Sequence, residues 1–163
     1  MIKILFICHG NICRSPIAEF YMKDLVQREG RADQFEIESA ATTDEEIWGD
    51  VGNPVYPPAR KILKEHGIDC SGKRARLIQS SDYEHFDLLI GMDRENITDM
   101  RSLWYPDPQK KLSLLLDWTD HPGNVADPWY TGDFRATWRD VSAGCQGLLK
   151  ALIRSGKVEK GRG

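Results

Sequence analysis

The chain has 163 residues, of which 40% are hydrophobic and 29% are charged. These values fit a single globular domain over residues 1–163 and argue against a disordered chain. The formal net charge of -3 gives no sign of a nucleic-acid partner. No apolar run approaches the roughly 20 residues that cross a bilayer, and the apolar N-terminal stretch is too short for a signal peptide. We therefore expect a cytoplasmic protein with neither a nucleic-acid nor a membrane partner.

The predicted elements alternate between strands and helices along the chain. Compact apolar runs predict buried strands, whereas apolar residues three and four positions apart predict helices. Ser15 followed by Pro16 is typical of a helix start, with Ser15 as the N-cap. The segments 42–56 and 117–132 are rich in polar residues, glycine and proline and are expected to be loops. The expected strands are 2–7, 35–40, 87–92 and 111–116, with a short strand near 76–78 left open, and the expected helices are 16–27, 57–66, 94–103 and 134–154.

Strands separated by helices predict an α/β fold in three layers, with a parallel sheet covered on both faces. Ligands of such sheets lie beyond the carboxyl ends of the strands. The first predicted strand ends at Ile7, so Cys8 should lie at this edge. The short basic tail 157–163 is expected to be a frayed end.

The four cysteines, Cys8, Cys13, Cys70 and Cys145, match no common zinc-binding spacing. No metal and no cofactor are therefore expected. In a reducing compartment all four should be thiols. We interpret Cys70 and Cys145 as small buried apolar groups.

The segment from Cys8 to Pro16 reads C-x5-R-S and lies between a predicted strand and a predicted helix. The five intervening residues can curl into a ring of backbone N–H groups that binds an anion, and the helix N-terminus adds partial positive charge. Gly10 permits a backbone angle that other residues resist, and Arg14 supplies a planar fork for two phosphate oxygens. A cysteine in this field should be a thiolate at neutral pH and a nucleophile toward phosphorus. In the alternative interpretation Cys8 only ends a strand and Arg14 is a surface charge, which leaves Gly10 and the flanking elements unexplained.

This segment resembles the signature of the low-molecular-weight protein tyrosine phosphatases, Cys-x-Gly-Asn-x-Cys-Arg-Ser-Pro. The resemblance covers nearly the whole chain. It implies a four-stranded parallel sheet with flanking helices and hydrolysis of phosphotyrosine through a cysteinyl-phosphate. Four further segments follow in the family's order: Ser39-Ala40-Ala41-Thr42, His66-Gly67-Ile68, Asp87-Leu88-Leu89-Ile90-Gly91-Met92-Asp93 and Asp127-Pro128-Trp129-Tyr130.

Asp127 is the expected proton donor. The phenolate of tyrosine is a poor leaving group because its pKa is about 10, so a general acid is needed. From the residues alone, Asp127 before Pro128 could equally start a turn. The resemblance implies that Asp127 acts as general acid and then as general base. Asp117 and Asp120 are nearby competitors, but neither precedes a proline.

The resemblance implies further roles around the reacting groups. His9 is expected at the rim with its side chain pointing outward, and Cys13 is expected to form a reversible disulfide with Cys8 under oxidation. The residues expected to surround phosphate are His9, Gly10, Asn11, Ile12, Cys13 and Arg14. Those expected to brace this loop are Asn11, Ser15, Ser39 and His66. Those expected to wall the substrate cleft are Ile12, Trp129 and Tyr130, together with Trp48, which is placed there by its polar loop and not by the resemblance and could equally pack on the edge of the core.

Three rival functions are compatible with a C-x5-R loop. Arsenate reductases need a closely spaced downstream cysteine pair, which Cys70 and Cys145 do not form. Protein arginine phosphatases typically carry threonine at the position of Ile12, whose apolar side chain suits an aromatic ring better. A phosphocarrier module has no need of a hydrolytic base such as Asp127. The expected partner is therefore a phosphotyrosine protein, for which a tyrosine kinase is one candidate, and the oligomeric state stays open.

Overall fold

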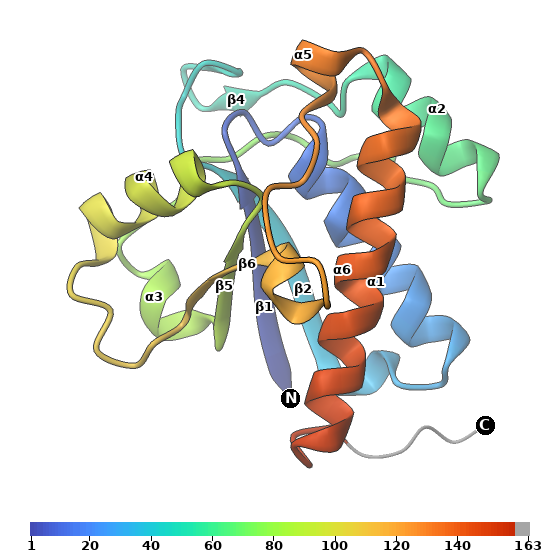
Figure 1. Cartoon of the computed structure of the whole chain (residues 1–163). Helices are drawn as coiled ribbons and strands as arrows, with labels where there is room; N and C mark the ends of the chain where they lie inside the picture. The colour runs from blue at the N-terminus through green and yellow to red at the C-terminus, as the bar shows by residue number, and fades with distance from the viewer. Residues whose placement is uncertain (159–163) are drawn as a thin grey trace.

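The computed structural model describes residues 1–158, and its centre is one sheet of four parallel strands (Figure 1). The strand order is β2-β1-β5-β6. This confirms the predicted α/β fold with a four-stranded parallel sheet. The strands are β1 (Ile2–Cys8), β2 (Phe35–Ala41), β5 (Leu88–Gly91) and β6 (Leu112–Leu114).

Helices cover both faces of the sheet and give three layers (Figure 1). Successive side chains of β1 point to opposite faces: Ile4 and Phe6 pack toward one set of helices, and Leu5 and Ile7 pack toward the other. All four are fully buried, as expected of a strand covered on both faces. On one face lie α1 (Arg14–Arg28), α2 (Pro57–Glu65) and α6 (Phe134–Arg154), and on the other lie α3 (Asp82–His85) and α4 (Arg94–Trp104).

Several short elements lie in segments that were expected to be irregular. The segment 42–56 contains an antiparallel pair of strands, β3 (Ile47–Trp48) and β4 (Val51–Gly52). A Cβ on Gly52 would lie 1.8 Å from the carbonyl oxygen of Ala75, so this pair depends on a distant segment. The segment 117–132 contains α5 (Pro128–Thr131), and two 3-10 helices, η1 (Ala32–Gln34) and η2 (Leu115–Trp118), complete the fold. At 76–78, where the sequence allowed a short strand, the structure has a single β-bridge between Ala41 and Leu77.

Two expectations near helix ends were wrong: the N-cap of the first helix and the start of the tail that follows the last one. Helix α1 begins at Arg14 and its N-cap is Cys13, so the prediction of Ser15 as N-cap was wrong. The hydroxyl of Ser15 is used elsewhere, in contacts described below. In the expected frayed tail, Val158 is only 3% exposed and packs on the core. The expectation was therefore wrong for Val158, while residues 159–163 lie outside the described part of the chain.

The thiols of Cys70 and Cys145 are buried in the core, as predicted, and burial raises the pKa of each. Cys145 packs in the layer formed by α1 and α6. None of the described helices combines the length and the apolar character needed to span a bilayer.

Candidate active site

The loop from Cys8 to Arg14, here called the Cys8 loop, joins the carboxyl end of β1 to the start of α1. Asn11 carries the left-handed backbone angle of this loop, with φ of 57°. The prediction that Gly10 does so was wrong, since Gly10 has no positive φ. A Cβ at Gly10 would lie 3.2 Å from Cγ of Glu46, so a larger residue there would require a small shift of the Glu46 side chain.

Hydrogen-bond donors surround the Cys8 sulfur, which is only 3% exposed at the residue level. The backbone N–H of Asn11 donates to Sγ at 3.3 Å and the backbone N–H of Ser15 donates at 3.5 Å. The hydroxyl of Ser15 lies 3.0 Å from the same sulfur. Donors at a helix start stabilise the thiolate form of cysteine. The geometry therefore makes Cys8 a candidate nucleophile.

A buried network of hydrogen bonds supports the Cys8 loop. Nδ2 of Asn11 donates to the hydroxyl of Ser15 at 2.8 Å and to that of Ser39 at 2.9 Å. Oδ1 of Asn11 accepts from the backbone N–H of Arg76 at 3.2 Å, which fixes the orientation of the amide. Ser39 in turn donates to Oε1 of Glu19 at 2.5 Å. The structure thus brings together three of the four predicted bracing residues, Asn11, Ser15 and Ser39.

Glu19 and Lys73 extend this network, and neither was singled out from the sequence. Nζ of Lys73 donates to the carbonyl oxygen of Ser39 at 2.8 Å and lies 3.3 Å from Oε1 of Glu19. Lys23 also pairs with Glu19, at 2.6 Å. Burial lowers the pKa of Lys73, and the charge of Glu19 opposes that shift. One signal was available: Glu19 follows Ser15 by four residues, which places both on one side of a helix.

His66 does not occupy the bracing position that was predicted for it. Its ring stacks on Trp138 of α6 with a centroid distance of 4.0 Å, and its Nδ1 contacts the carbonyl oxygen of Ile62 at 2.9 Å. Among the described residues, it is Lys73 that contacts Ser39 from the segment after α2. His66 lies at the end of α2, where α2 packs near α6, and so it is directed away from the Cys8 loop.

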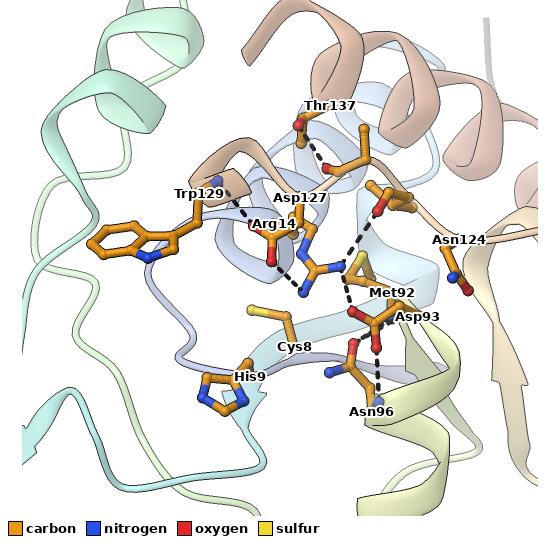
Figure 2. A network of polar contacts seen from close by, with 12 residues as sticks. Cys8, His9, Arg14, Met92, Asp93, Asn96, Asn124, Asp127, Trp129 and Thr137 are labelled. Carbon is orange, nitrogen blue, oxygen red and sulfur yellow. Dashed lines mark hydrogen bonds and ion pairs between the residues drawn. The ribbon is translucent and has the colours of Figure 1, made fainter. Parts of the chain in front are cut away.

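The Arg14 guanidinium is buried between two carboxylates (Figure 2). Nη1 donates to Oδ2 of Asp93 at 2.7 Å and to the carbonyl oxygen of Val125 at 3.4 Å. Nη2 lies 3.4 Å from Oδ2 of Asp127. Burial acts to lower the pKa of Arg14, but Cys8 and the two carboxylates outweigh it and the pKa is raised. Arg14 therefore remains a cation near Cys8.

Asp93 is a further residue that no sequence argument assigned to the site. It follows β5 and caps α4, and its Oδ1 accepts from the backbone N–H of Asn96 at 2.8 Å. The capping contact fixes the carboxylate, so the other oxygen can hold Arg14 in one orientation. One signal was available: Asp93 follows a predicted strand of the parallel sheet, so it should lie at the same edge of the sheet as Cys8.

Asp127 lies at the start of α5 and is held from two sides (Figure 2). Its Oδ1 accepts from the backbone N–H of Trp129 at 3.0 Å. The preceding residue, Ala126, donates its N–H to Asp140 at 2.9 Å, and its carbonyl accepts from the Thr137 hydroxyl at 2.8 Å. Because Asp140 and Thr137 belong to α6, the long helix anchors the segment that carries the carboxylate.

The predicted reacting groups, on Cys8, Arg14 and Asp127, all line one cavity of about 670 Å³. Trp48 is not part of its wall: the side chain is on the β3–β4 pair, the residue is 75% exposed, and Glu45 and Glu46 of the same segment line the cavity instead. The prediction of Trp48 as a cleft residue is therefore not supported. The lining residues are Cys8, His9, Gly10, Ile12, Cys13, Arg14, Glu45, Glu46, Asp93, Glu95, Asn124, Val125, Ala126, Asp127, Trp129 and Tyr130.

His9 and Cys13 lie in the same cavity wall but differ in character. His9 is partly exposed, and its Nε2 lies 2.8 Å from Oε2 of Glu45, which places it at the rim. Cys13 is buried, and burial together with the neighbouring Cys8 raises the pKa of its thiol to about 12. At neutral pH Cys13 is therefore a neutral thiol.

Within residues 1–158, one group of side chains has the spacing of a cation site. Glu36, Glu38 and His85 place ligand-type atoms within 4.8 Å of one another. None of the three lines the cavity that holds Cys8. Exposed acidic groups of this kind are common without an ion.

Comparisons with known proteins identify the family of this chain. The sequence model of the family described as low molecular weight phosphotyrosine protein phosphatase matches residues 3–158. The chain is 36% identical over 155 residues to the low molecular weight protein-tyrosine-phosphatase YfkJ of Bacillus subtilis, covering 93% of this chain and 96% of YfkJ.

Solved structures show the same relationship. The crystal structure of YfkJ gives a TM-score of 0.89 at 34% identity over 95% of this chain and 96% of that one. SP-PTP from Streptococcus pyogenes gives 0.81 at 39% identity over 94% of each chain. The drosophila arginine phosphatase DARP gives 0.81 at 27% identity over 93% of this chain and 98% of that one, so the fold alone does not distinguish the two substrates. The family match and the YfkJ relationship place this chain in the low molecular weight protein-tyrosine-phosphatase family, as a hydrolase of phosphotyrosine.

Proposed function

We propose that Cys8, Arg14 and Asp127 carry out phosphotyrosine hydrolysis in two steps. The observation that carries the proposal is that all three line one cavity, with donors around the Cys8 sulfur. In the first step the Cys8 thiolate attacks phosphorus and the bond from phosphorus to the tyrosine oxygen breaks. Asp127 gives its proton to that oxygen, because phenolate is a poor leaving group. The products are a cysteinyl-phosphate and a free tyrosine.

In the second step water hydrolyses the cysteinyl-phosphate. Asp127, now a carboxylate, takes a proton from the attacking water, and the Cys8 thiolate leaves. The Ser15 hydroxyl, 3.0 Å from the sulfur, can donate to the thiolate as it departs. Throughout both steps the Arg14 fork and the backbone N–H groups of the Cys8 loop hold the equatorial phosphate oxygens, with Asp93 keeping Arg14 in place.

The walls of the cavity favour an aromatic substrate over phosphoarginine. Ile12 is apolar and lies in the lining, together with Trp129 and Tyr130. Ile12 carries this preference, because its apolar side chain fits a tyrosine ring and offers no hydrogen-bond partner to a phosphorylated guanidine group. The substrate class is phosphoprotein, and within it we propose a phosphorylated tyrosine kinase as one candidate. The mechanism needs a free thiol, so we place the protein in a reducing compartment, the cytoplasm.

Two substitutions test the mechanism on 4-nitrophenyl phosphate in the presence of EDTA. Cys8→Ser should abolish turnover, because a hydroxyl is a far weaker nucleophile than a thiolate. Asp127→Ala should lower kcat by ~10² or more, and the loss should be greater for phenyl phosphate, whose leaving group needs the proton more. Asp120→Ala is the matched control, since Asp120 is an exposed acid in the same region that does not line the cavity.

The outcomes separate the alternatives. Full activity in both active-site variants would show that the mechanism is wrong. Faster hydrolysis of phosphoarginine than of phosphotyrosine would favour the arginine phosphatase. A stable phosphorylated Cys8 that water does not release would favour the carrier module.

A further inference from the structure

The lining of the cavity contains more carboxylates than the proposed mechanism uses. Asp127 has its catalytic role and Asp93 holds Arg14, which leaves Glu45, Glu46 and Glu95 in the lining. Among the lining residues the cationic side chains are Arg14 and the titratable His9. Arg14 is 4% exposed, and the proposed mechanism uses it to hold phosphate. We call the three glutamates the acidic rim.

The acidic rim comes from two separate elements. Glu45 and Glu46 belong to the segment between β2 and β3, and Glu95 belongs to the first turn of α4. Glu46 accepts from Nδ2 of Asn53 at 2.7 Å, which fixes one of its oxygens. The side chain of Glu45 is 65% exposed and pairs with Nε2 of His9 at 2.8 Å, whereas the exposed side chain of Glu95 has no hydrogen-bond or ion-pair partner among residues 1–158. The Glu95 carboxylate and the exposed part of the Glu45 carboxylate are therefore accessible to a bound substrate.

A second feature of the same cavity also suits a cation. Trp129 and Tyr130 line the cavity and are 64% and 87% exposed. The face of an aromatic ring attracts a lysine ammonium or an arginine guanidinium through its quadrupole. Exposed rings and carboxylates thus border the place where a phosphotyrosine must enter, and both chemistries favour positive charge beside it.

We propose that the acidic rim selects phosphotyrosines whose neighbouring residues are lysine or arginine. The inference rests on the proposed function, because it concerns the residues that flank the phosphotyrosine bound at Cys8. A peptide with acidic flanks would bring its carboxylates beside Glu45, Glu46 and Glu95 and would be repelled. Each exposed charge pair has a modest effect, so several together give a preference of about tenfold in kcat/KM.

The test compares two phosphotyrosine peptides that differ only in lysine against glutamate at the flanking positions. At low salt the lysine peptide should have a kcat/KM about tenfold higher. The ratio should fall toward one at 1 M salt, where the screening length is about 3 Å. Glu95→Gln, and Glu45→Gln combined with it, should reduce the ratio, each variant being normalised to its own rate on 4-nitrophenyl phosphate. Asp50→Asn is the control, since Asp50 is exposed between β3 and β4 but does not line the cavity.

Equal kcat/KM for the two peptides, or a preference for the glutamate peptide, would overturn the role of the acidic rim and leave the proposed function intact. A preference that salt does not reduce would also overturn it, and this measurement needs no variant to fold. If neither peptide nor 4-nitrophenyl phosphate is hydrolysed, the catalytic assignment fails, and the rim fails with it.

Discussion

Removing the ammonium of Lys73 should destabilise the protein strongly, although Lys73 does not line the cavity. Lys73→Met keeps the length and the apolar stem of the side chain but leaves Glu19 without one of its cations. The Glu19 side chain is 4% exposed, and breaking a buried ion pair by removing one partner costs about 3–5 kcal/mol. Lys23 remains 2.6 Å from Glu19, and burial already lowers the pKa of Lys73, so we expect the lower end, about 3 kcal/mol.

In a chain of this size such a loss corresponds to a drop of about 6–12 °C in Tm. Thermal and urea denaturation would measure it, with kcat/KM recorded in parallel because the same network holds the Cys8 loop. Lys23→Met is the control: its side chain is 45% exposed and Lys73 stays beside Glu19 in this variant, so the loss should be smaller than in Lys73→Met. Adding Glu19→Gln to Lys73→Met should restore part of the loss, since it removes the buried charge that has lost one of its two partners. Equal stability of the Lys73→Met and Lys23→Met variants would refute the reasoning.

Three further predictions concern the groups around the sulfur. Asp93→Asn weakens a charged hydrogen bond to Arg14, so kcat/KM should fall about 10- to 100-fold and inorganic phosphate should become a weaker competitive inhibitor; an unchanged inhibition constant would contradict this. Iodoacetamide at pH 8 should alkylate Cys8 and spare Cys13, because a pKa of about 12 leaves roughly one Cys13 thiol in 10⁴ ionised; mass spectrometry showing equal modification would exclude that environment. Peroxide should oxidise Cys8 to a sulfenic acid, and the Cys13 thiol should then condense with it to a disulfide and release water. Disulfide formation should be faster at higher pH, where more Cys13 is ionised, and a thiol reductant should reverse it. Direct oxidation of Cys8 to sulfinic acid without a Cys8–Cys13 disulfide would disprove the switch.

Much of the fold was predictable because its strands are buried on both faces. A largely apolar run such as 2–7 predicts a strand that is covered on both faces, and helices between such strands predict that the strands are parallel. The short elements were missed for a physical reason. The β3–β4 pair packs closely on Ala75, and α5 is capped by Asp127, so each depends on contacts or capping that apolar periodicity does not report.

The residues of the site also fall into those that the sequence predicts and those that it does not. Cys8, Arg14 and Asp127 were predicted because the chemistry restricts both residue type and local setting, and the structure brings the three to one cavity. Glu19 and Lys73 were not, because a charged residue on a helix or in a loop is usually solvated. Only the packing of α1 beside the segment around Lys73 shows that Glu19 is buried and paired.

The two oxygens of the Asp127 carboxylate have separate tasks, and this has a mechanical consequence. One oxygen is bound to the backbone of Trp129, whereas the other faces Arg14 across 3.4 Å. In the proposed mechanism the oxygen beside Arg14 is the one that carries the proton to the substrate. Because the other oxygen is bound to the backbone N–H of Trp129, and Trp129 lines the cavity, a shift of the Trp129 main chain would also move the carboxylate that delivers this proton.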